Sequence, residues 1–333
     1  MVAGRDAKLS NDRPNIWALA SGKGGVGKSL LAANLACLLA ESEWPTTAVD
    51  LDLHGANLHT LLGVGRPEIG VSEVLCGERS VQEVRKPHSV PGLSYIGGHG
   101  ERAEHTTHEG RSGLVAQLSQ LSDKAVILDL GTGTADSVLD FFVAADVPLL
   151  IVTPEPASVE NAYRFLRSVY LYLLEKDARK RGVEGPVAKV IAAAHEAWKP
   201  LDLEPKLVAI DPGLSDVRRR FSEGRQIGLV LNQVRTRKDV GLGFAMVGAV
   251  KRHFGFDVGF LTAIPWDPNL WLSIRRRKLM RRGDDDEFIS EGLACLADNV
   301  IEGGGLTSHD DVALPEAGWL SGGSAGADTV RTL

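Results

Sequence analysis

The stretch that decides the fold is ALASGKGGVGKSLLAANLACLLA, residues 18–40. It contains the pattern G-x-x-x-x-G-K-[ST] from Gly22 to Ser29, after an apolar run and before a segment rich in alanine and leucine. An apolar strand, a glycine loop and a helix in this order are the setting in which the pattern binds phosphate. The glycines let backbone N–H groups point at phosphate oxygens, and the helix N-terminus adds its positive dipole end. The sequence therefore predicts a phosphate-binding loop.

Each part of this loop has an expected role. Lys28 is expected to reach the β- and γ-phosphates of a nucleotide, and the Ser29 hydroxyl to ligate Mg²⁺. The nucleotide-binding residues of the loop are expected to be Gly22, Gly24, Gly25, Val26, Gly27, Lys28, Ser29 and Leu30. The alternative is a tight glycine turn without a ligand, but motif and context together favour the phosphate site.

Two carboxylate segments support a nucleotide site. AVDLDL, residues 48–53, places Asp50 and Asp52 at the end of a second expected strand. AVILDLGTG, residues 125–133, places Asp129 at the end of another strand, directly before two spaced glycines. Such an aspartate can hold a Mg²⁺-bound water, although each one alone would be an ordinary turn residue. Together with the loop they predict a nucleoside-triphosphate hydrolase.

Apolar runs and helical segments alternate along the chain. Strands are expected at residues 15–20, 46–53, 124–130, 147–153, 227–234 and 260–265, and helices at 28–42 and 158–176. This alternation is typical of an α/β fold with a mainly parallel, twisted sheet and helices on both faces. We therefore predict a P-loop nucleotide-hydrolase domain over residues 15–302, with a charged insertion at 176–224. Residues 1–14 are expected to form a flexible lead, and the Gly/Ser-rich residues 303–333 a disordered tail.

Composition restricts the class of protein. The net charge of −6 over 333 residues gives no whole-chain case for nucleic-acid binding, so any such contact has to be local. The cysteines Cys37, Cys76 and Cys295 are scattered, which argues against a disulfide framework or a zinc site and for a reducing compartment. No run reaches the length of a membrane span, and the N-terminus has no apolar signal core. We therefore expect a cytoplasmic protein.

The segment KGGVGKS, residues 23–29, resembles the deviant phosphate loop of the MinD/ParA group of ATPases, in which Lys23 is the additional signature lysine. DLDLHGANLHTLLG, residues 50–63, resembles the first switch segment of that group. Residues 126–146 resemble the Walker B and second-switch stretch. LLIVTPEPASVENAY, residues 149–163, is most similar in wording to the FlhG/FleN branch, the MinD-like regulators of flagellar number. The resemblance runs from about residue 15 to residue 300.

This resemblance implies roles for the site residues. In this group the signature lysine crosses a dimer interface and contacts the partner's nucleotide phosphates, so that ATP lies between two subunits. Lys23 would act in this way, and Asp52 would orient the attacking water. The implied catalytic set is Lys23, Lys28, Asp52 and Asp129, with ATP bound. The implied Mg²⁺ site is Ser29, Asp52 and Asp129, with the carboxylates binding through water.

Two later segments resemble the base-binding parts of the family. LVLNQV, residues 229–234, is similar to the strand whose asparagine reads adenine, which would be Asn232. AIPWDP, residues 263–268, is similar to the loop along the base, with Pro265 and Asp267 at the matching positions.

The function that the resemblance implies is an ATP-dependent homodimer switch. It would hydrolyse ATP to ADP and phosphate slowly, under stimulation by a protein partner, and would position a flagellum, the division site, a chromosome or another cargo. A partner could recruit it to the membrane or the nucleoid. One alternative is a nucleotide-gated interaction protein with weak or no hydrolysis. Another is an iron–sulfur or cofactor-assembly ATPase, which needs cysteine pairs that this chain lacks, and a small-molecule kinase would not explain Lys23.

The C-terminal part of the chain indicates whether the protein binds a membrane or DNA. FISEGLACLADNVIE, residues 288–302, predicts a helix with one apolar face and an acidic polar side. A membrane-surface helix prefers Lys and Arg there, so we expect this helix to pack on the core and direct membrane binding to be absent. Residues 275–282 contain a basic cluster, followed by an acidic run at 284–287. The cluster could bind DNA nonspecifically or could be a solvated helix end; its members are Arg275, Arg276, Arg277, Lys278, Arg281 and Arg282.

Overall fold

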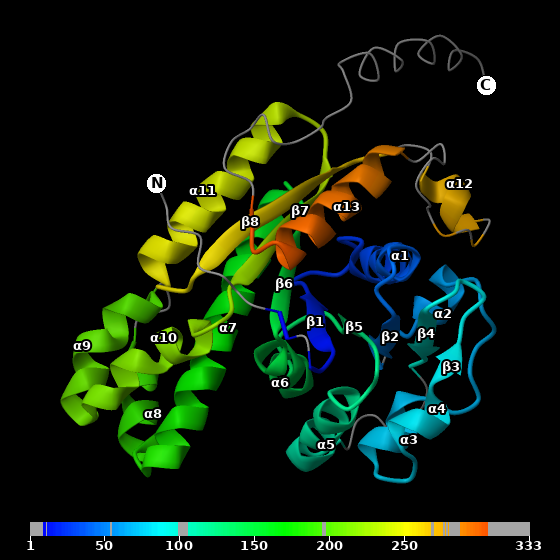
Figure 1. Ribbon diagram of the computed structural model, residues 1–333. Helices are drawn as coiled ribbons and strands as arrows, with labels where there is room; N and C mark the ends of the chain where they lie inside the picture. Colours follow the sequence, from blue (N-terminus) through cyan, green and yellow to red (C-terminus); the bar gives the residue numbers. More distant parts are fainter. Residues whose placement is uncertain are drawn as a thin grey trace, which may run out of the picture.

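The chain folds around one twisted sheet, seen in a computed structural model (Figure 1). The structure describes residues 9–305 apart from residues 11, 54, 99–105, 195–197, 268–269, 276, 278 and 280–286. Within these residues the sheet has eight strands in the order β3-β4-β2-β5-β1-β6-β7-β8, all parallel except the β3–β4 pair. The strands are β1 (Asn15–Ala20), β2 (Thr46–Leu51), β3 (Lys86–Pro87), β4 (Leu93–Ile96), β5 (Ala125–Leu130), β6 (Val147–Val152), β7 (Ile227–Val234) and β8 (Val258–Pro265). The predicted α/β class with a mainly parallel sheet is confirmed.

Helices cover both faces of this sheet because the central strands are apolar on both sides. Trp17 and Leu19 of β1 face one core, which they share with α1 (Lys28–Glu41) and α13 (Glu287–Ile301). Ile16 and Ala18 face the other core, because successive side chains of a strand point to opposite faces. The helices of that second face are α5 (His108–Leu118), α6 (Asp136–Ala144), α7 (Pro156–Arg181) and α11 (Arg237–His253).

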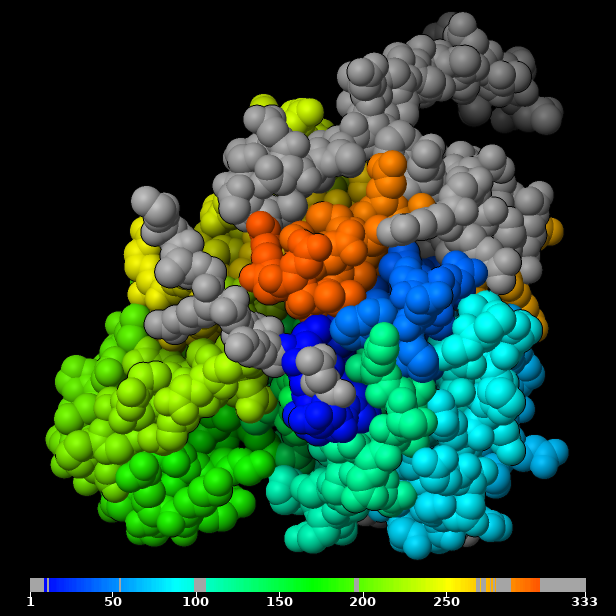
Figure 2. Space-filling model, in the orientation of Figure 1, coloured from blue at the N-terminus to red at the C-terminus, as the bar shows by residue number. Residues whose placement is uncertain are grey.

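The segment predicted as a charged insertion is a small helical lobe. The helix α7 runs for 26 residues, far beyond the sheet, and ends at Gly182, whose φ of 68° gives a left-handed C-cap. After it come α8 (Glu184–Ala192), α9 (Pro200–Ile210), the 3₁₀ helix η2 (Pro212–Asp216) and α10 (Val217–Ser222). Figure 2 shows this lobe at one side of the molecule. Its charges are partly internal, since Arg218 is buried and pairs with Glu204 at 2.8 Å.

Helix α13 packs on the core through one apolar face, as predicted. Five of its side chains are buried beside α1 and β8: Ile289, Leu293, Leu296, Ala297 and Val300. The side chain of Phe288, which was predicted on the same face, lies outside the described part. Across the described residues, no helix is both long and apolar enough to cross a membrane. The remaining short helices are α2 (Leu58–Leu61), α3 (Val71–Leu75), α4 (Val81–Val84) and α12 (Leu270–Arg275).

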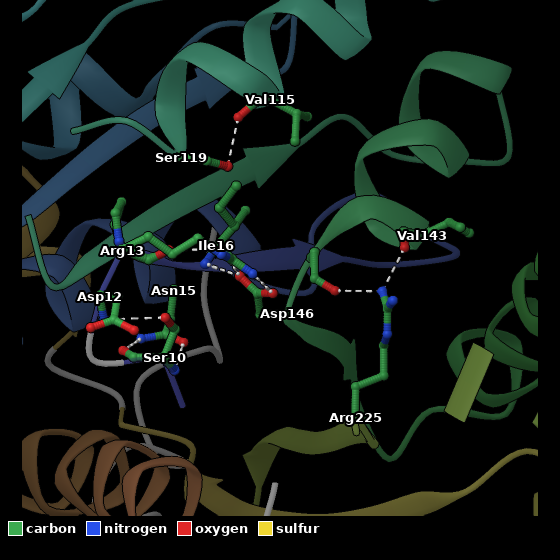
Figure 3. A network of polar contacts seen from close by, with 12 residues as sticks. Ser10, Asp12, Arg13, Asn15, Ile16, Val115, Ser119, Val143, Asp146 and Arg225 are labelled. Carbon is green, nitrogen blue, oxygen red and sulfur yellow. Dashed lines mark hydrogen bonds and ion pairs between the residues drawn. The ribbon is translucent and has the colours of Figure 1, made fainter. Parts of the chain in front are cut away.

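The chain just before β1 is attached to the start of β6 (Figure 3). The Arg13 guanidinium makes two bonds to the Asp146 carboxylate, at 2.7 and 2.8 Å, and the backbone N–H of Ile16 donates to the same carboxylate at 2.9 Å. Beside it, Arg225 donates to the carbonyl oxygens of Val143 and Ala145 at 2.8 and 2.9 Å. These bonds tie together the segments that enter β1, β6 and β7, at the end of the sheet opposite to the glycine loop.

Candidate functional site

The glycine loop follows β1 and leads directly into α1, as its sequence predicts. Gly25 and Gly27 have φ angles of 81° and 90°, a left-handed conformation that glycine adopts without steric cost. Gly27 is also the N-cap of α1, so the loop ends where the backbone N–H groups of the helix are free to bind an anion. At Gly22 a Cβ atom would lie 2.2 Å from the Asn161 carbonyl oxygen of α7. The close approach of α7 therefore requires a residue without a side chain at Gly22.

Lys28 and Asp129 form a buried ion pair below the loop. The Lys28 Nζ lies 2.7 Å from Asp129 Oδ1, and the two side chains are 4% and 0% exposed. Lys28 begins α1 and Asp129 lies near the end of β5, which pairs with β1 along the whole strand. The sheet thus brings together two residues that are 101 positions apart. A buried charge needs such a partner, because an unpaired one costs several kcal/mol.

Two further carboxylates, those of Asp50 and Asp52, lie beside this pair. Asp50 of β2 lies opposite Asp129 in the register of β2 with β5. The Asp50 carboxylate accepts from the backbone N–H groups of Asp52 and Leu58, both at 3.1 Å, and so ties the two ends of the loop between β2 and α2. Asp52 lies beside Gly131, where a Cβ atom would come within 3.8 Å of its Oδ1. The two predicted switch segments therefore touch each other at Asp52.

These residues fit a Mg²⁺ site that is completed by phosphate. Asp129 Oδ2 is buried and accepts no hydrogen bond from any described residue, so one carboxylate oxygen is left for a ligand. Asp52 Oδ1 accepts a backbone bond from Gly55 at 3.0 Å, and carboxylates are ligands that Mg²⁺ prefers. Among the described residues, no group of three or more His, Cys, Asp or Glu side chains could hold a metal alone. Mg²⁺ in nucleotide sites typically takes one or two protein ligands, phosphates and water, which agrees with this arrangement.

The other lysine of the loop lies apart from this buried group. The Lys23 Nζ lies 2.7 Å from Glu155 Oε2, and the two side chains are 40% and 59% exposed. Glu155 is the residue before α7, at the end of the β6 loop. The two lysines therefore occupy different environments: Lys28 is buried and paired inside the site, and Lys23 is half-exposed at its surface.

The predicted base-binding residues lie at the ends of β7 and β8. The Asn232 side chain is buried and donates to the Val26 carbonyl oxygen of the glycine loop at 2.8 Å. Pro265 ends β8 beside Val234, and Asp267 follows two residues later. Between them stands Trp266, with the Arg235 guanidinium 4.5 Å from the centre of its ring. The structure therefore brings Asn232 to the glycine loop.

Sequence reasoning did not identify two residues around the loop. Glu155 pairs with Lys23, and the Gln233 side chain reaches the Gly25 carbonyl oxygen at 3.4 Å. Asp50 was predicted only as a strand-end carboxylate, and the structure shows that it binds the backbone of the loop between β2 and α2. Gln233 directly follows Asn232, so the signal that could have found it is its place in the strand. Glu155 has no such signal, because its partner is 132 positions away.

Of the predicted basic cluster, Arg275 and Arg277 are described, and both are exposed. The Arg277 carbonyl oxygen lies near α2, within 3.0 Å of where a Cβ atom of Gly63 would be. The other four members, Arg276, Lys278, Arg281 and Arg282, lie outside the described residues.

The carboxylates predict an unusual pH dependence of stability without metal. Burial, and after it the neighbouring Asp129 carboxylate, raise the pKa of Asp50 to about 7. Burial also raises the pKa of Asp129, against the opposing effect of Lys28. A raised pKa means that the folded protein binds protons more tightly than the unfolded chain, so stability is present at low pH and lost as pH rises.

Between pH 4 and pH 7 we expect the free energy of unfolding of metal-free protein to fall, with Asp50 contributing at most about 4 kcal/mol. Urea unfolding at a series of pH values in EDTA measures this change. In Asp50→Asn, the part of the change of unfolding free energy with pH that comes from Asp50 should disappear. If this variant shows the same pH dependence as the wild type, the effect comes from other groups.

The geometry agrees with comparisons to known proteins. Residues 17–280 match the family described as the CobQ/CobB/MinD/ParA nucleotide binding domain. The chain is 32% identical over 156 residues to the antiactivator FleN of Pseudomonas aeruginosa, a match that covers 46% of this chain and 55% of FleN. It is 31% identical over 161 residues to the flagellum site-determining protein YlxH of Helicobacter pylori, covering 45% of this chain and 52% of YlxH. The match thus spans about half the length of these curated relatives.

Solved structures share the fold at lower identity. The septum site-determining protein MinD of Pyrococcus horikoshii, complexed with Mg-ADP, aligns with a TM-score of 0.56 at 18% identity, over 86% of this chain and 96% of that one. A plasmid partition protein of Borrelia burgdorferi bound to AMPPNP aligns with a TM-score of 0.56 at 18% identity, over 86% and 100% of the two chains. The similarity to the FlhG/FleN branch predicted from residues 149–163 is confirmed by the two flagellar relatives. Since the family match covers most of the chain, from the strand before the glycine loop to the segment after β8, this protein belongs to the CobQ/CobB/MinD/ParA nucleotide-binding family of P-loop ATPases.

Proposed function

We propose that this protein is a Mg²⁺-dependent ATPase that works as an ATP-dependent dimer switch. In this proposal the glycine loop, residues 22–30, holds the phosphates, and Lys28 contacts the β- and γ-phosphates. Ser29 ligates Mg²⁺ directly, and Asp52 and Asp129 hold it through water. When bound, Mg²⁺ supplies charge neutralisation at the phosphates of ATP.

The chemistry of the chain's own residues follows from their surroundings. Asp52 is half-buried with a carboxylate that meets few donors, so it can orient and polarise an attacking water. Asn232 and the loop at Pro265 and Asp267 hold adenine in this proposal, close to the phosphate loop that Asn232 already contacts. Slow hydrolysis suits a switch that has to persist in its ATP state until a protein partner stimulates it.

The observation that carries the dimer proposal is the separation of the two lysines. Lys28 is buried against Asp129, whereas the Lys23 side chain is 40% exposed and forms a surface ion pair with Glu155. A surface ion pair contributes little and exchanges readily with water, so Lys23 is free to leave it. A second copy of the chain with ATP bound would offer Lys23 three phosphates, and a cation there neutralises charge that develops in the transition state.

Gel filtration with ADP, ATP or a slowly hydrolysed ATP analogue tests this proposal. We expect the wild type to form a dimer with ATP and the analogue and to stay monomeric with ADP. Lys23→Ala is expected to bind ATP, measured by equilibrium binding of labelled nucleotide, and to stay monomeric throughout. Glu160→Ala is a matched surface control, because Glu160 is exposed and pairs with Arg164 on the same turn of α7. A wild type that is monomeric with every nucleotide would rule the dimer switch out.

We further propose that the ATP-bound dimer is cytoplasmic and positions a cellular structure, with a protein partner that recruits it to the membrane or the nucleoid. One of its relatives, YlxH, is named a flagellum site-determining protein, which favours a flagellum as the cargo. An interaction protein without hydrolysis is less well supported, because Lys28, Asp52 and Asp129 all lie together. An iron–sulfur role is disfavoured, because Cys37 is buried while Cys76 is exposed, and Cys295 lies on α13.

A second candidate activity is nonspecific DNA binding. Arg275 and Arg277 are exposed, as phosphate contacts require, and they belong to a stretch with six basic residues. Fluorescence anisotropy with a random-sequence duplex, at several salt concentrations and with ADP or the ATP analogue, would measure this. Binding that weakens steeply with salt and is lost in the double variant Arg275→Ala, Arg277→Ala supports it, and anisotropy unchanged by protein excludes it.

A further inference from the structure

Gln233 has a strained backbone beside the glycine loop. Its φ angle is +61°, a left-handed conformation that residues other than glycine rarely adopt. The register between β7 and β8 shifts at the same place, between Asn232 and Val234, as it does at a β-bulge. Strained backbone of this kind persists only where the surrounding structure enforces it, and it is common at functional sites.

The bulge turns two successive amide side chains toward the same loop. In a regular strand neighbouring side chains point to opposite faces. Here Asn232 donates to the carbonyl oxygen of Val26 at 2.8 Å, and Gln233 donates to that of Gly25 at 3.4 Å. The left-handed residue is therefore what lets both amides reach consecutive peptides of the loop.

The two halves of the loop are held with different strength. The second half is fixed from inside: Val26 is buried, Asn232 binds it at 2.8 Å, and Lys28 is buried against Asp129. The first half, residues 23–25, is held at its start by the Ser21 hydroxyl, which donates to the Lys23 carbonyl oxygen at 3.0 Å. On its outer side it is held by the exposed Lys23–Glu155 pair and by the long bond from Gln233. These two outer contacts face solvent, where bonds exchange at small cost. The half that carries Lys23 is thus the more weakly held half.

We propose that Gln233 is a positioning residue that holds the Lys23-bearing half of the loop in the monomer and lets go of it when that half engages a second ATP-bound copy of the chain. The proposal rests on the dimer switch proposed above and adds a regulatory step to it. Gln233 and Glu155 bind adjacent parts of the loop, so each keeps Lys23 folded back on its own chain. Removal of the Gln233 amide then favours the released arrangement.

Gln233→Gly removes the amide and suits the left-handed backbone. Gln233→Asn tolerates that backbone and keeps an amide, but it is one methylene shorter and cannot reach Gly25 as Gln233 does. Glu43→Gly is the matched control, because Glu43 also has a φ of 61° but lies exposed after α1, away from the site. The control separates relief of strain from loss of the bond to the loop.

The first test is amide hydrogen exchange of nucleotide-free protein. In both Gln233 variants we expect the peptide that covers residues 22–26 to exchange about fivefold faster than in the wild type, as loss of a weak hydrogen bond predicts. Glu43→Gly should leave this peptide unchanged. Equal exchange in all four proteins would overturn the proposed hold, and this result does not depend on whether the protein dimerises.

The second test is the protein concentration at half-dimerisation with the slowly hydrolysed ATP analogue, measured by analytical ultracentrifugation. We expect it to fall about two- to tenfold in the Gln233 variants, to stay constant in Glu43→Gly, and to show no Gln233 effect in a Lys23→Ala background. An unchanged or weaker dimer in Gln233→Gly would overturn the proposed release. A wild type that never dimerises would instead refute the dimer switch, while the exchange result still decides whether Gln233 holds the loop.

Discussion

Replacing Lys28 with alanine is expected to abolish ATP turnover and to lower the free energy of unfolding by about 3–5 kcal/mol. The loss of turnover follows from its place at the phosphates in the proposed site. The loss of stability follows from the structure alone, because Lys28 Nζ is the cation paired with Asp129 at 2.7 Å, and both side chains are buried. Without Lys28 the Asp129 carboxylate remains in the core without its partner. Steady-state phosphate release and urea unfolding of the same preparation measure the two effects.

The double variant Lys28→Ala, Asp129→Ala separates these two effects. It removes both charges, so we expect it to regain a large part of the lost stability while turnover stays absent. If the double variant were as unstable as the sum of the two single ones, the damage would come from lost packing rather than from an unpaired buried charge.

Replacing Asp52 with asparagine is expected to lower turnover by about 10²–10⁴-fold and to leave ATP binding in place. Asparagine keeps the side-chain shape and one oxygen that can accept from Gly55. It loses the negative charge that polarises water. In the proposed switch the ATP-bound dimer should therefore accumulate, which gel filtration with ATP at intervals after mixing would show as a long-lived dimer peak.

Asp202→Asn is a suitable control for the Asp52 variant. Asp202 accepts from the backbone of Lys199 at the start of α9, in the helical lobe, so its replacement should leave turnover unchanged. Full turnover in Asp52→Asn would remove Asp52 from the proposed mechanism and would direct attention to Asp50 and Asp129 as the remaining carboxylates.

The sequence predicts the parts of this molecule that depend on local pattern. Three such parts are the glycine loop, the apolar strands and the apolar face of α13. Each depends on one short continuous segment of the sequence, and the structure contains all of them. The short strands β3 and β4 were not predicted, because two and four residues are too few to show a period. For the helices of the lobe, the sequence predicted only a charged insertion. Ion pairs such as Arg218–Glu204 place charged residues inside this lobe, so its helices do not show a simple division into an apolar and a charged face.

The contacts that complete the site could not be predicted, for a different reason. Glu155 and Gln233 reach the glycine loop only because β6 and β7 follow β1 in the sheet. The order of parallel strands is set by how helices pack on both faces, and no single stretch encodes it. The bulge at Gln233 is a property of the β7–β8 register, which the residues of β7 alone do not determine.

The separation of Val26 and Asn232 along the sequence also affects how the protein folds during its synthesis. The bond between them joins residues 206 positions apart, so the glycine loop leaves the ribosome long before the strand that supports it. At about 5–20 residues per second, the interval is on the order of 10–40 s. During that time the nascent chain carries the nucleotide signature without the frame that shapes it. We therefore expect nucleotide binding to begin only after most of the chain has been translated.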